Sequence, residues 1–413
     1  MYNYLADFLH KKFHIDAHYF LKGGFWLSVT QGIVVLSGLI STALFAHHLS
    51  ENTYGVYRYL IGLAAILASF SLTGIGESIL QTAAKKYYNF YQETLKINFL
   101  YSCGISIAGI IGAIYYWINS NEVLALGCLL IATFQPFINT LQFIPAYLQG
   151  DHRYKEATIN QLIKTLIVTI ASIIVLFQTN NVLLLFATYL MTQTLANLVS
   201  YTIYKKNQTS IRTPDEVKNS YIKYAKHTSF RNAISLIANR LDAVVIFSSL
   251  GAASLAVYTI AIIVPEQIKG SLKNLMALLV PKYSRSETNF NSRYIKKRSV
   301  QIFLLLSFVT GVYILIAPYI YSVIFPKYAE SILYSQIFAL SIPSFVFYIP
   351  YSILKVKLDE KALYRITFTS SVTQISLLLV MTTLFGIIGT IISNVIYRYI
   401  LAGIVYYNYY KSL

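Results

Sequence analysis

The stretch SLIANRLDAVVIFSSLGAASLAVYTIAIIV, residues 235–264, decides the fold class of this chain. Apolar residues extend on both sides of the short turn LGAAS, and about 20 such residues suffice for a helix to cross a bilayer. The stretch therefore predicts the end of one membrane-spanning helix and the start of the next. It also contains Arg240 and Asp242, two charges that hydrocarbon disfavours, so we expect them to face a protein interior or a hydrated cavity.

The composition of the whole chain agrees with a membrane protein. Of its 413 residues, 56% are hydrophobic and 12% are charged, whereas soluble domains carry about 25% charged residues. The net charge of +17 fits either a nucleic-acid partner or the basic cytoplasmic loops of a membrane protein. Cys103 and Cys128 lie in apolar runs, and their positions predict neither a disulfide framework nor a metal site. No motif for a cofactor is present in the sequence.

Long apolar runs recur along the chain and predict an all-α integral membrane protein with twelve spans. The expected spans are 24–46, 56–80, 97–118, 122–148, 158–177, 182–204, 228–250, 253–280, 299–325, 330–354, 363–385 and 387–410.

The basic residues are concentrated in alternate connections between these spans. Twenty-four of the 33 Lys and Arg residues lie in the N-terminus, in the C-terminus and in every second connection. The intervening turns contain only Lys327. Lys and Arg accumulate in cytoplasmic loops, so this asymmetry predicts that both termini are cytoplasmic and excludes a nucleic-acid partner.

Two weak internal similarities suggest a repeat. The segment LSENTYGVY (residues 49–57) parallels LGAASLAVY (residues 250–258), and FIPAYLQGDHRYKEA (143–157) parallels YIPYSILKVKLDEKA (348–362). Both pairs occupy matching places in two halves of six spans. We therefore expect an N-terminal lobe over 1–204, a cytoplasmic linker over 205–227 and a C-terminal lobe over 228–413, related as parallel repeats.

The predicted turns on the outer side are short and leave no room for a catalytic domain on that side. The sequence contains no nucleophile elbow, phosphate-binding loop or metal-ligand cluster. These observations favour a carrier over an enzyme, because substrate in transporters with parallel repeats binds between the two halves.

Several charged residues fall inside the expected spans. A central charge costs about 2.5–3.5 kcal/mol on insertion scales, so such residues face a bundle interior or water. One interpretation is that they form structural ion pairs between helices, and for Arg58 and Arg365 that they extend to the membrane surface. The other is a hydrated, mainly cationic cavity for an anionic substrate. The residues are Arg58, Glu77, Lys164, Arg231, Arg240, Asp242, Glu266, Lys269, Lys273, Arg365 and Arg398.

Helical spacing relates some of these charges to one another. At about 100° per residue, Glu266, Lys269 and Lys273 lie on one face of the eighth span. Arg231 and Asp242 also return to one face of the seventh span, so we expect them to pair. Arg240 points elsewhere and is left without this partner, which makes it our leading candidate for an anion-binding residue.

Several segments resemble a known family. The segments LSENTYGVY and TGIGES near the N-terminus, NRLDAVVIFSSLGAASLAVY in the middle and VPKYSR at residues 280–285 are similar to motifs of the polysaccharide-biosynthesis (Wzx-type) flippases. Those proteins belong to the multidrug/oligosaccharidyl-lipid/polysaccharide exporter (MOP) superfamily. Carried over by position, Arg240 and Asp242 match the charged element of the family's seventh span, and Glu77 follows the glycine motif of the second.

The resemblance implies two six-helix lobes of the MATE/MOP type that open alternately to the two sides of a bacterial inner membrane. It implies a lipid-linked oligosaccharide as substrate, with the polymerase and glycosyltransferases of the same pathway as partners. Coupling to H⁺ or Na⁺ would use Asp242, Glu77 or Glu266 as the titratable group. The alternatives are a drug/cation antiporter of the same superfamily and, from another class, a membrane polysaccharide polymerase.

Overall fold

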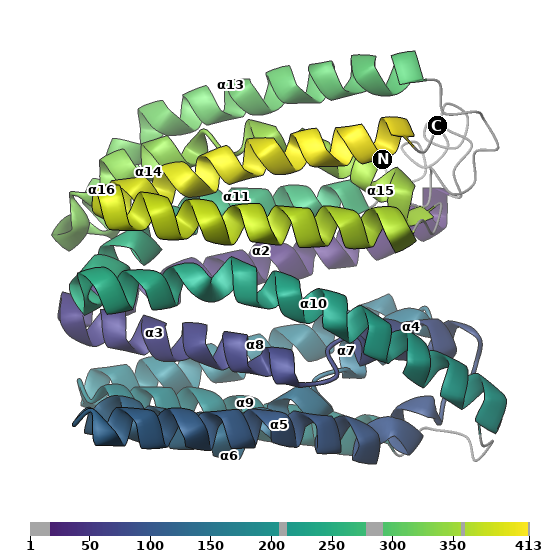
Figure 1. The fold of residues 1–413 in the computed structure, drawn as a ribbon. Helices are drawn as coiled ribbons and strands as arrows, with labels where there is room; N and C mark the ends of the chain where they lie inside the picture. Colours follow the sequence, from purple (N-terminus) through teal and green to yellow (C-terminus); the bar gives the residue numbers. More distant parts are fainter. Residues whose placement is uncertain (1–16, 206–212, 278–291, 357–359, 412–413) are drawn as a thin grey trace. The chain divides into compact units, whose positions relative to one another are not determined.

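The computed structural model describes the backbone of residues 17–205, 213–277, 292–356 and 360–411, and the side chains of 31–205, 213–272, 295–355 and 361–411. Within these ranges all regular structure is helical (Figure 1). The longer helices are α2 (Ala17–His48), α3 (Glu51–Leu67), α4 (Ile75–Ala84), α5 (Phe90–Ile118), α6 (Glu122–Leu141), α7 (Ile144–Gly150), α8 (Tyr154–Gln178), α9 (Val182–Lys205), α10 (Asp215–Leu250), α11 (Ala252–Ala277), α13 (Ser292–Ile324), α14 (Ser331–Ala339), α15 (Tyr348–Val356) and α16 (Glu360–Lys411).

The prediction of twelve spans is confirmed for the described residues, with one merged pair. Eleven segments are long and apolar enough to cross a membrane. The last of them, α16, contains Gly386 with φ 61° and ψ −138°, a non-helical conformation open to glycine. When α16 is divided at Gly386, its two parts correspond to the expected eleventh and twelfth spans, 363–385 and 387–410.

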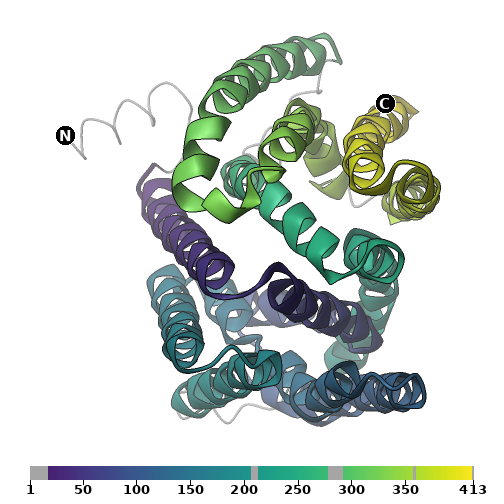
Figure 2. The same ribbon diagram turned by 90° about the vertical axis from the view of Figure 1, so that its left-hand side faces the viewer.

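The chain folds into two compact units. Unit 1 comprises residues 1–39 and 260–413, and unit 2 comprises residues 40–259. Both α2 and α11 therefore contribute to each unit, and in each unit the long helices run alongside one another (Figures 1 and 2). The division into lobes 1–204 and 228–413 is a division by sequence repeat, and it stays a prediction.

Lipid-facing surface is visible on individual helices. On α13 in unit 1, Leu315, Tyr319 and Val323 are 74%, 75% and 77% exposed. They are spaced four residues apart and so form one stripe along the helix. Large exposed apolar stripes of this kind do not suit water, and they agree with a helix packed against hydrocarbon.

The helix starts in unit 2 explain the first sequence similarity. The Ser50 hydroxyl accepts a hydrogen bond from Thr53 N at 3.2 Å and caps α3, which starts at Glu51. The helix α11 starts at Ala252, after Gly251 with φ 87° ends α10. The two starts are 201 residues apart, which is the offset of the similarity.

The second similarity also corresponds to a structural repeat. Each Ile-Pro pair lies in the first turn of the short helix that ends the fourth span of its half. Pro145 is the second residue of α7, and Pro350 is the third residue of α15. Proline is tolerated in a first turn, where its missing N–H would have no intrahelical acceptor.

The second span is interrupted, which the sequence prediction of one helix over 56–80 missed. The helix α3 ends at Leu67, a short 3₁₀ turn follows, and α4 starts at Ile75. Gly74 lies in the gap and donates its N–H to Ser229 Oγ at 2.8 Å. A Cβ on Gly74 would lie 2.5 Å from the Ala225 carbonyl oxygen, so the close approach to α10 requires glycine.

Three prolines inside helices share one arrangement. A proline cannot donate to the carbonyl four residues earlier. For Pro136 in α6 that carbonyl, on Ala132, accepts from Ser106 Oγ of α5 at 2.7 Å. For Pro265 in α11 and Pro318 in α13, the corresponding carbonyls accept from side chains of neighbouring helices. The pairs are Tyr321 Oη with Ala261 O at 3.0 Å and Gln336 Nε2 with Ile314 O at 2.9 Å.

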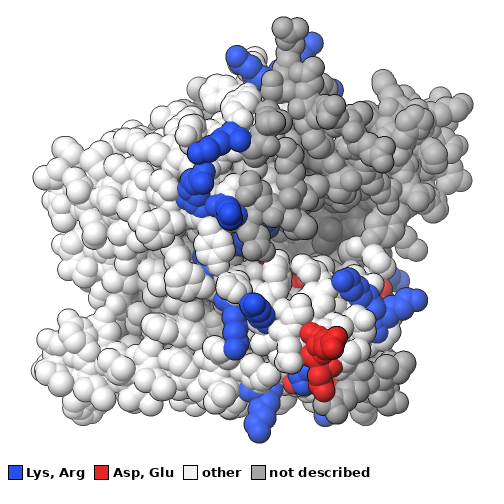
Figure 3. All heavy atoms as spheres, turned by 45° about the vertical axis from the view of Figure 1, so that its right-hand side comes forward, with Lys and Arg blue, Asp and Glu red and all other residues white. Residues whose placement is uncertain are grey.

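The basic connections of unit 2 meet at one end of that unit. Lys218 at the start of α10 pairs with Glu93 at the start of α5 at 3.9 Å. Lys85 after α4 lies 5.6 Å from the Tyr221 ring centroid, and Arg153 before α8 lies 5.9 Å from that of Tyr204. In Figure 3, Lys and Arg are likewise gathered on part of the visible surface with a patch of Asp and Glu among them, and the described surface at the left of the view is white. That this end faces the cytoplasm stays a prediction.

Candidate functional site

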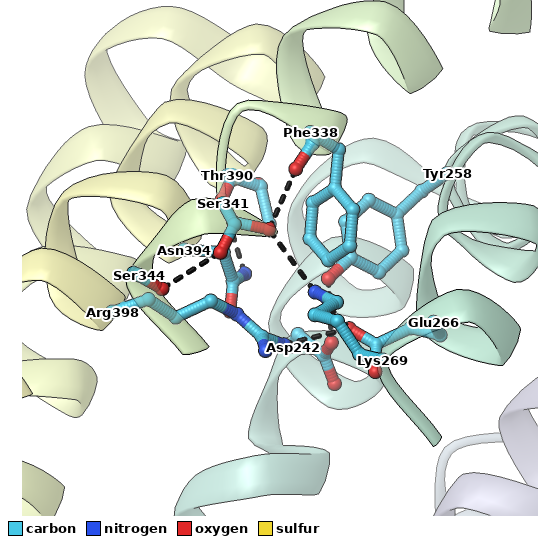
Figure 4. A network of polar contacts seen from close by, with 10 residues as sticks. All are labelled: Asp242, Tyr258, Glu266, Lys269, Phe338, Ser341, Ser344, Thr390, Asn394 and Arg398. Carbon is cyan, nitrogen blue, oxygen red and sulfur yellow. Dashed lines mark hydrogen bonds and ion pairs between the residues drawn. The ribbon is translucent and has the colours of Figure 1, made fainter. Parts of the chain in front are cut away.

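A charge cluster in unit 1 joins one carboxylate to two cations (Figure 4). Glu266 Oε1 lies 2.8 Å from Lys269 Nζ and 2.6 Å from Arg398 Nη2. Glu266 and Lys269 are three residues apart on α11, a spacing that makes helical side chains neighbours. Arg398 comes from the second part of α16. We call Glu266, Lys269 and Arg398 the Glu266 triad, and its formal charges sum to a single positive charge.

Lys269 is the buried member of the triad, with 4% of its side chain exposed. Besides Glu266 it contacts Ser341 Oγ at 3.0 Å, and its ammonium lies 4.1 Å from the centroid of the Phe338 ring. Phe338 belongs to the last turn of α14, where the carbonyl end of the helix dipole favours a cation. The ammonium therefore has a carboxylate, a hydroxyl, a ring face and a helix end around it.

Arg398 is placed differently, because 24% of its side chain is exposed. Its guanidinium carbon lies 5.4 Å from the centroid of the same Phe338 ring, and Nη2 donates to Glu266. A guanidinium has five N–H donors. Its Nε is buried and has no hydrogen-bond partner among the described residues. Arg398 thus has donor capacity left after its ion pair with Glu266.

The interruption of the tenth span holds the partners of Lys269 in place. After α14 ends at Ala339, Ser341 Oγ donates to Phe338 O at 2.6 Å and Ser344 Oγ donates to Ser341 O at 2.7 Å. Tyr399, which follows Arg398 on α16, donates its hydroxyl to Leu340 O at 2.8 Å. These bonds supply side-chain donors to carbonyls at the helix break, which matters where no water is available.

The expected pairing of Asp242 with Arg231 is wrong. Within the described residues these two form no ion pair, and Asp242 Oδ2 instead accepts from the Tyr258 hydroxyl at 2.6 Å (Figure 4). Eleven residues return to one helix face but rise about 16 Å along the axis, beyond the reach of the two side chains. Tyr258 lies on α11 across the turn at Gly251, and this contact is within unit 2.

Arg240 and Arg58 share an aromatic neighbour in unit 2. Tyr189 on α9 interacts electrostatically with both guanidinium groups. Arg58 is half-buried and also interacts with Tyr54 and Tyr57, whereas Arg240 is exposed. The structure therefore leaves Arg240 accessible, and its role as an anion-binding residue stays a prediction.

Lys164 has a neutral partner. Its Nζ donates to Asn197 Oδ1 at 3.1 Å, between α8 and α9. One turn earlier, Asn160 Nδ2 donates to Ser200 Oγ at 2.9 Å between the same helices. The two bonds form a polar contact along the pair, and among the described residues Lys164 forms no ion pair with a carboxylate.

The remaining predicted residues have other partners or lie outside the described side chains. Glu77, in the first turn of α4, accepts from the Tyr224 hydroxyl at 3.0 Å. Arg365 donates from Nη1 to Asn408 Oδ1 at 3.2 Å, in agreement with a position at a helix end. The side chain of Lys273 lies outside the described residues.

Sequence reasoning found all three charges of the triad but missed the neutral residues around them. Phe338 and Ser341 are ordinary members of an apolar span by sequence. The one available signal was the SIPS pattern at 341–344, where a proline between serines predicts a helix break with local hydroxyl donors. Within the described residues no group of His, Cys, Asp and Glu side chains could hold a metal ion.

Residues 20–287 match the family described as polysaccharide biosynthesis protein. The chain belongs to this family. No curated protein matches the sequence.

Solved structures show the same fold at low sequence identity. The lipid II flippase MurJ in an inward closed conformation has a TM-score of 0.70 at 14% identity, covering 92% of this chain and 86% of that one. An inward-facing multidrug resistance MATE family transporter of the MOP superfamily has a TM-score of 0.64 at 14% identity, covering 95% and 93%. A mutant of the Vibrio cholerae MATE transporter VcmN has a TM-score of 0.59 at 13% identity, covering 95% and 97%.

Proposed function

We propose that this protein is a flippase for a lipid-linked oligosaccharide. It would move an undecaprenyl-pyrophosphate-linked repeat unit from the inner to the outer leaflet of the bacterial inner membrane, for O-antigen, capsule or a related surface polysaccharide. The family assignment supports a role in polysaccharide biosynthesis, and the fold shared with a lipid II flippase supports a lipid-linked substrate.

The observation that carries the proposal is the charge balance of the Glu266 triad. Two cations share one carboxylate inside a membrane-spanning helix bundle, and one of them retains free donors. A fixed positive charge with a planar fork of donors suits phosphate oxygens, which arginine binds in pairs. A cavity for a cationic drug would instead need carboxylates in excess.

The other predicted residues have assigned places in this proposal. Arg240, Arg231, Arg58, Lys164 and Lys273 would add to the cationic lining between two six-helix lobes that alternate in access. Asp242, Glu77 and Glu266 are the candidates for H⁺ or Na⁺ coupling. Both termini would be cytoplasmic, next to the glycosyltransferases that make the substrate and upstream of the polymerase that consumes it.

The test measures surface polysaccharide in cells that depend on this protein. Arg398, Lys269 and Arg240 are replaced singly by alanine and compared at matched protein levels. We expect at least a severalfold loss of polysaccharide in each. The control is Lys297→Ala, which removes an exposed lysine near the start of α13 and should change nothing.

Undiminished polysaccharide in all three variants would refute the cationic site. A drug/cation antiporter of the same superfamily makes the opposite prediction in a second assay. Expression would then raise resistance to cationic drugs and leave polysaccharide unchanged. That result would replace the flippase proposal with the antiporter.

A further inference from the structure

The two cations of the Glu266 triad are not equivalent, and the difference assigns them separate tasks. Lys269 has 4% of its side chain exposed, against 24% for Arg398 and 39% for Glu266. Both cations bind the same oxygen of Glu266. A ligand that approaches from the exposed side therefore meets the carboxylate and the guanidinium before it meets the ammonium.

Lys269 has no donor left for a ligand. An ammonium has three N–H donors. One points to Glu266 Oε1 and one to Ser341 Oγ, and the Phe338 ring face covers the ammonium at 4.1 Å. Lys269 is thus enclosed by groups from α11, α14 and the turn after α14, all of them in unit 1.

Arg398 has unused N–H donors, and Glu266 already accepts from one of its nitrogens, where a ligand would also bind. One of its bonds goes to Glu266, while Nε is buried without a partner among the described residues. A phosphate group would bind the fork of the guanidinium through two oxygens. A phosphate that uses Nη2 for this fork competes with Glu266 Oε1, which accepts from that nitrogen at 2.6 Å.

We propose that Glu266 is an internal counterion that the phosphate of the substrate displaces from Arg398. In the empty site Glu266 neutralises Arg398. When the phosphate binds, Arg398 turns to it and Glu266 remains paired with Lys269. The inference rests on the proposed function, because it takes a phosphate-bearing lipid as the ligand.

This exchange leaves each charge of the triad paired in both states. A buried charge without a partner is strongly unfavourable, so a carboxylate that lost Arg398 would need a second cation. Lys269 supplies it, and the bonds to Ser341 and Phe338 keep it in position. Lys269 is by this reasoning a positioning residue, and Arg398 is the residue that touches the substrate. The return of Glu266 to Arg398 would then favour release.

The test measures binding of farnesyl pyrophosphate, a short prenyl pyrophosphate, to the full-length protein in lipid nanodiscs. Inorganic pyrophosphate and farnesol are the comparison ligands. Glu266→Gln removes the competing charge, and we expect the dissociation constant to fall about tenfold, equivalent to about 1.4 kcal/mol. Arg398→Gln should raise it by at least as much. Glu93→Gln removes a carboxylate that pairs with Lys218 elsewhere and should change nothing.

The decisive comparison concerns Lys269. Lys269→Met removes one of the two cations that bind Glu266, so Glu266 should pair more tightly with Arg398 and binding of the ligand should weaken about tenfold. In the double variant Glu266→Gln/Lys269→Met the competitor is absent, and binding should be at least as tight as in the wild type. The double variant also preserves the net charge, which guards against misfolding. We therefore expect the effects of the two substitutions on the dissociation constant to be non-additive.

Three results would overturn the inference. In the first, Lys269→Met weakens binding by the same factor with and without Glu266, which would make Lys269 a direct ligand. In the second, Glu266→Gln binds no more tightly than the wild type. In the third, farnesol binds as well as farnesyl pyrophosphate. None of them contradicts the flippase proposal, which is judged by surface polysaccharide alone.

Discussion

Gly55 offers a direct test of how closely two helix starts approach in unit 2. It lies in the first turns of α3, and a Cβ built on it would lie 1.9 Å from the carbonyl oxygen of Ala252 and 3.0 Å from its Cα. Nonbonded heavy atoms prefer about 3.5–4.0 Å, so Gly55→Ala must push the start of α3 away from the start of α11. Both Ala252 atoms belong to the backbone, so they cannot move away by a change of side-chain rotamer.

The expected cost follows from two opposing effects. Overpacking typically costs about 1–3 kcal/mol, and displacement of backbone belongs at the upper end. The higher helix propensity of alanine offsets up to about 1 kcal/mol of this cost. We therefore expect Gly55→Ala to destabilise the protein by about 1–2 kcal/mol or more.

The assay is thermal unfolding of the purified protein in detergent at one fixed scan rate, since such transitions are often irreversible. The apparent midpoint of Gly55→Ala should fall by several degrees. Gly403→Ala is the matched control, because nothing lies within 4 Å of its added Cβ, and its midpoint should hold or rise. A Gly55→Ala protein as stable as the wild type would show that α3 and α11 do not approach as described.

Two further substitutions test polar contacts inside the bundles by the same measurement. Tyr321→Phe removes the hydroxyl shared by the carbonyls of Ile260, at 2.9 Å, and Ala261, at 3.0 Å, and should cost about 1–3 kcal/mol. The cost should be smaller in a Pro265→Ala background, where the helix supplies an N–H to the Ala261 carbonyl. Equal costs in both backgrounds would contradict the role assigned to the hydroxyl. Lys164→Met removes a cation whose partner is the neutral Asn197, and since a central charge costs about 2.5–3.5 kcal/mol we expect stability to hold or increase. A marked loss of stability in Lys164→Met would show that the lysine has a stronger partner.

The fold was largely predictable because membrane spans are long and their local signals are strong. The predicted eighth span, 253–280, begins within one residue of α11 at Ala252, whereas α3 begins at Glu51, five residues before the predicted second span, 56–80. The break before α4 was not predicted, because the approach of Gly74 to α10 joins residues about 150 positions apart. Nothing local in the sequence distinguishes that glycine from one in a continuous helix.

The site was predictable only where its residues share one helix. Glu266 and Lys269 lie on one face at a spacing of three residues, and they do form an ion pair. Arg398 joins them from 132 residues away, which periodicity cannot show. The pairing of Arg231 with Asp242 failed because helical angle was considered without helical rise.

The three internal prolines have a mechanical consequence. Each one converts a bond that would lie within a helix into a tether to a neighbouring helix, through Ser106, Tyr321 or Gln336. In hydrocarbon a carbonyl that loses its donor finds no water to replace it, so sliding of the tethered helices against each other is penalised. The pairs α5–α6, α11–α13 and α13–α14 should therefore travel as fixed blocks during transport. Bending would then fall to the places where the backbone leaves the helical conformation, the gap before α4 and the turn at Gly386.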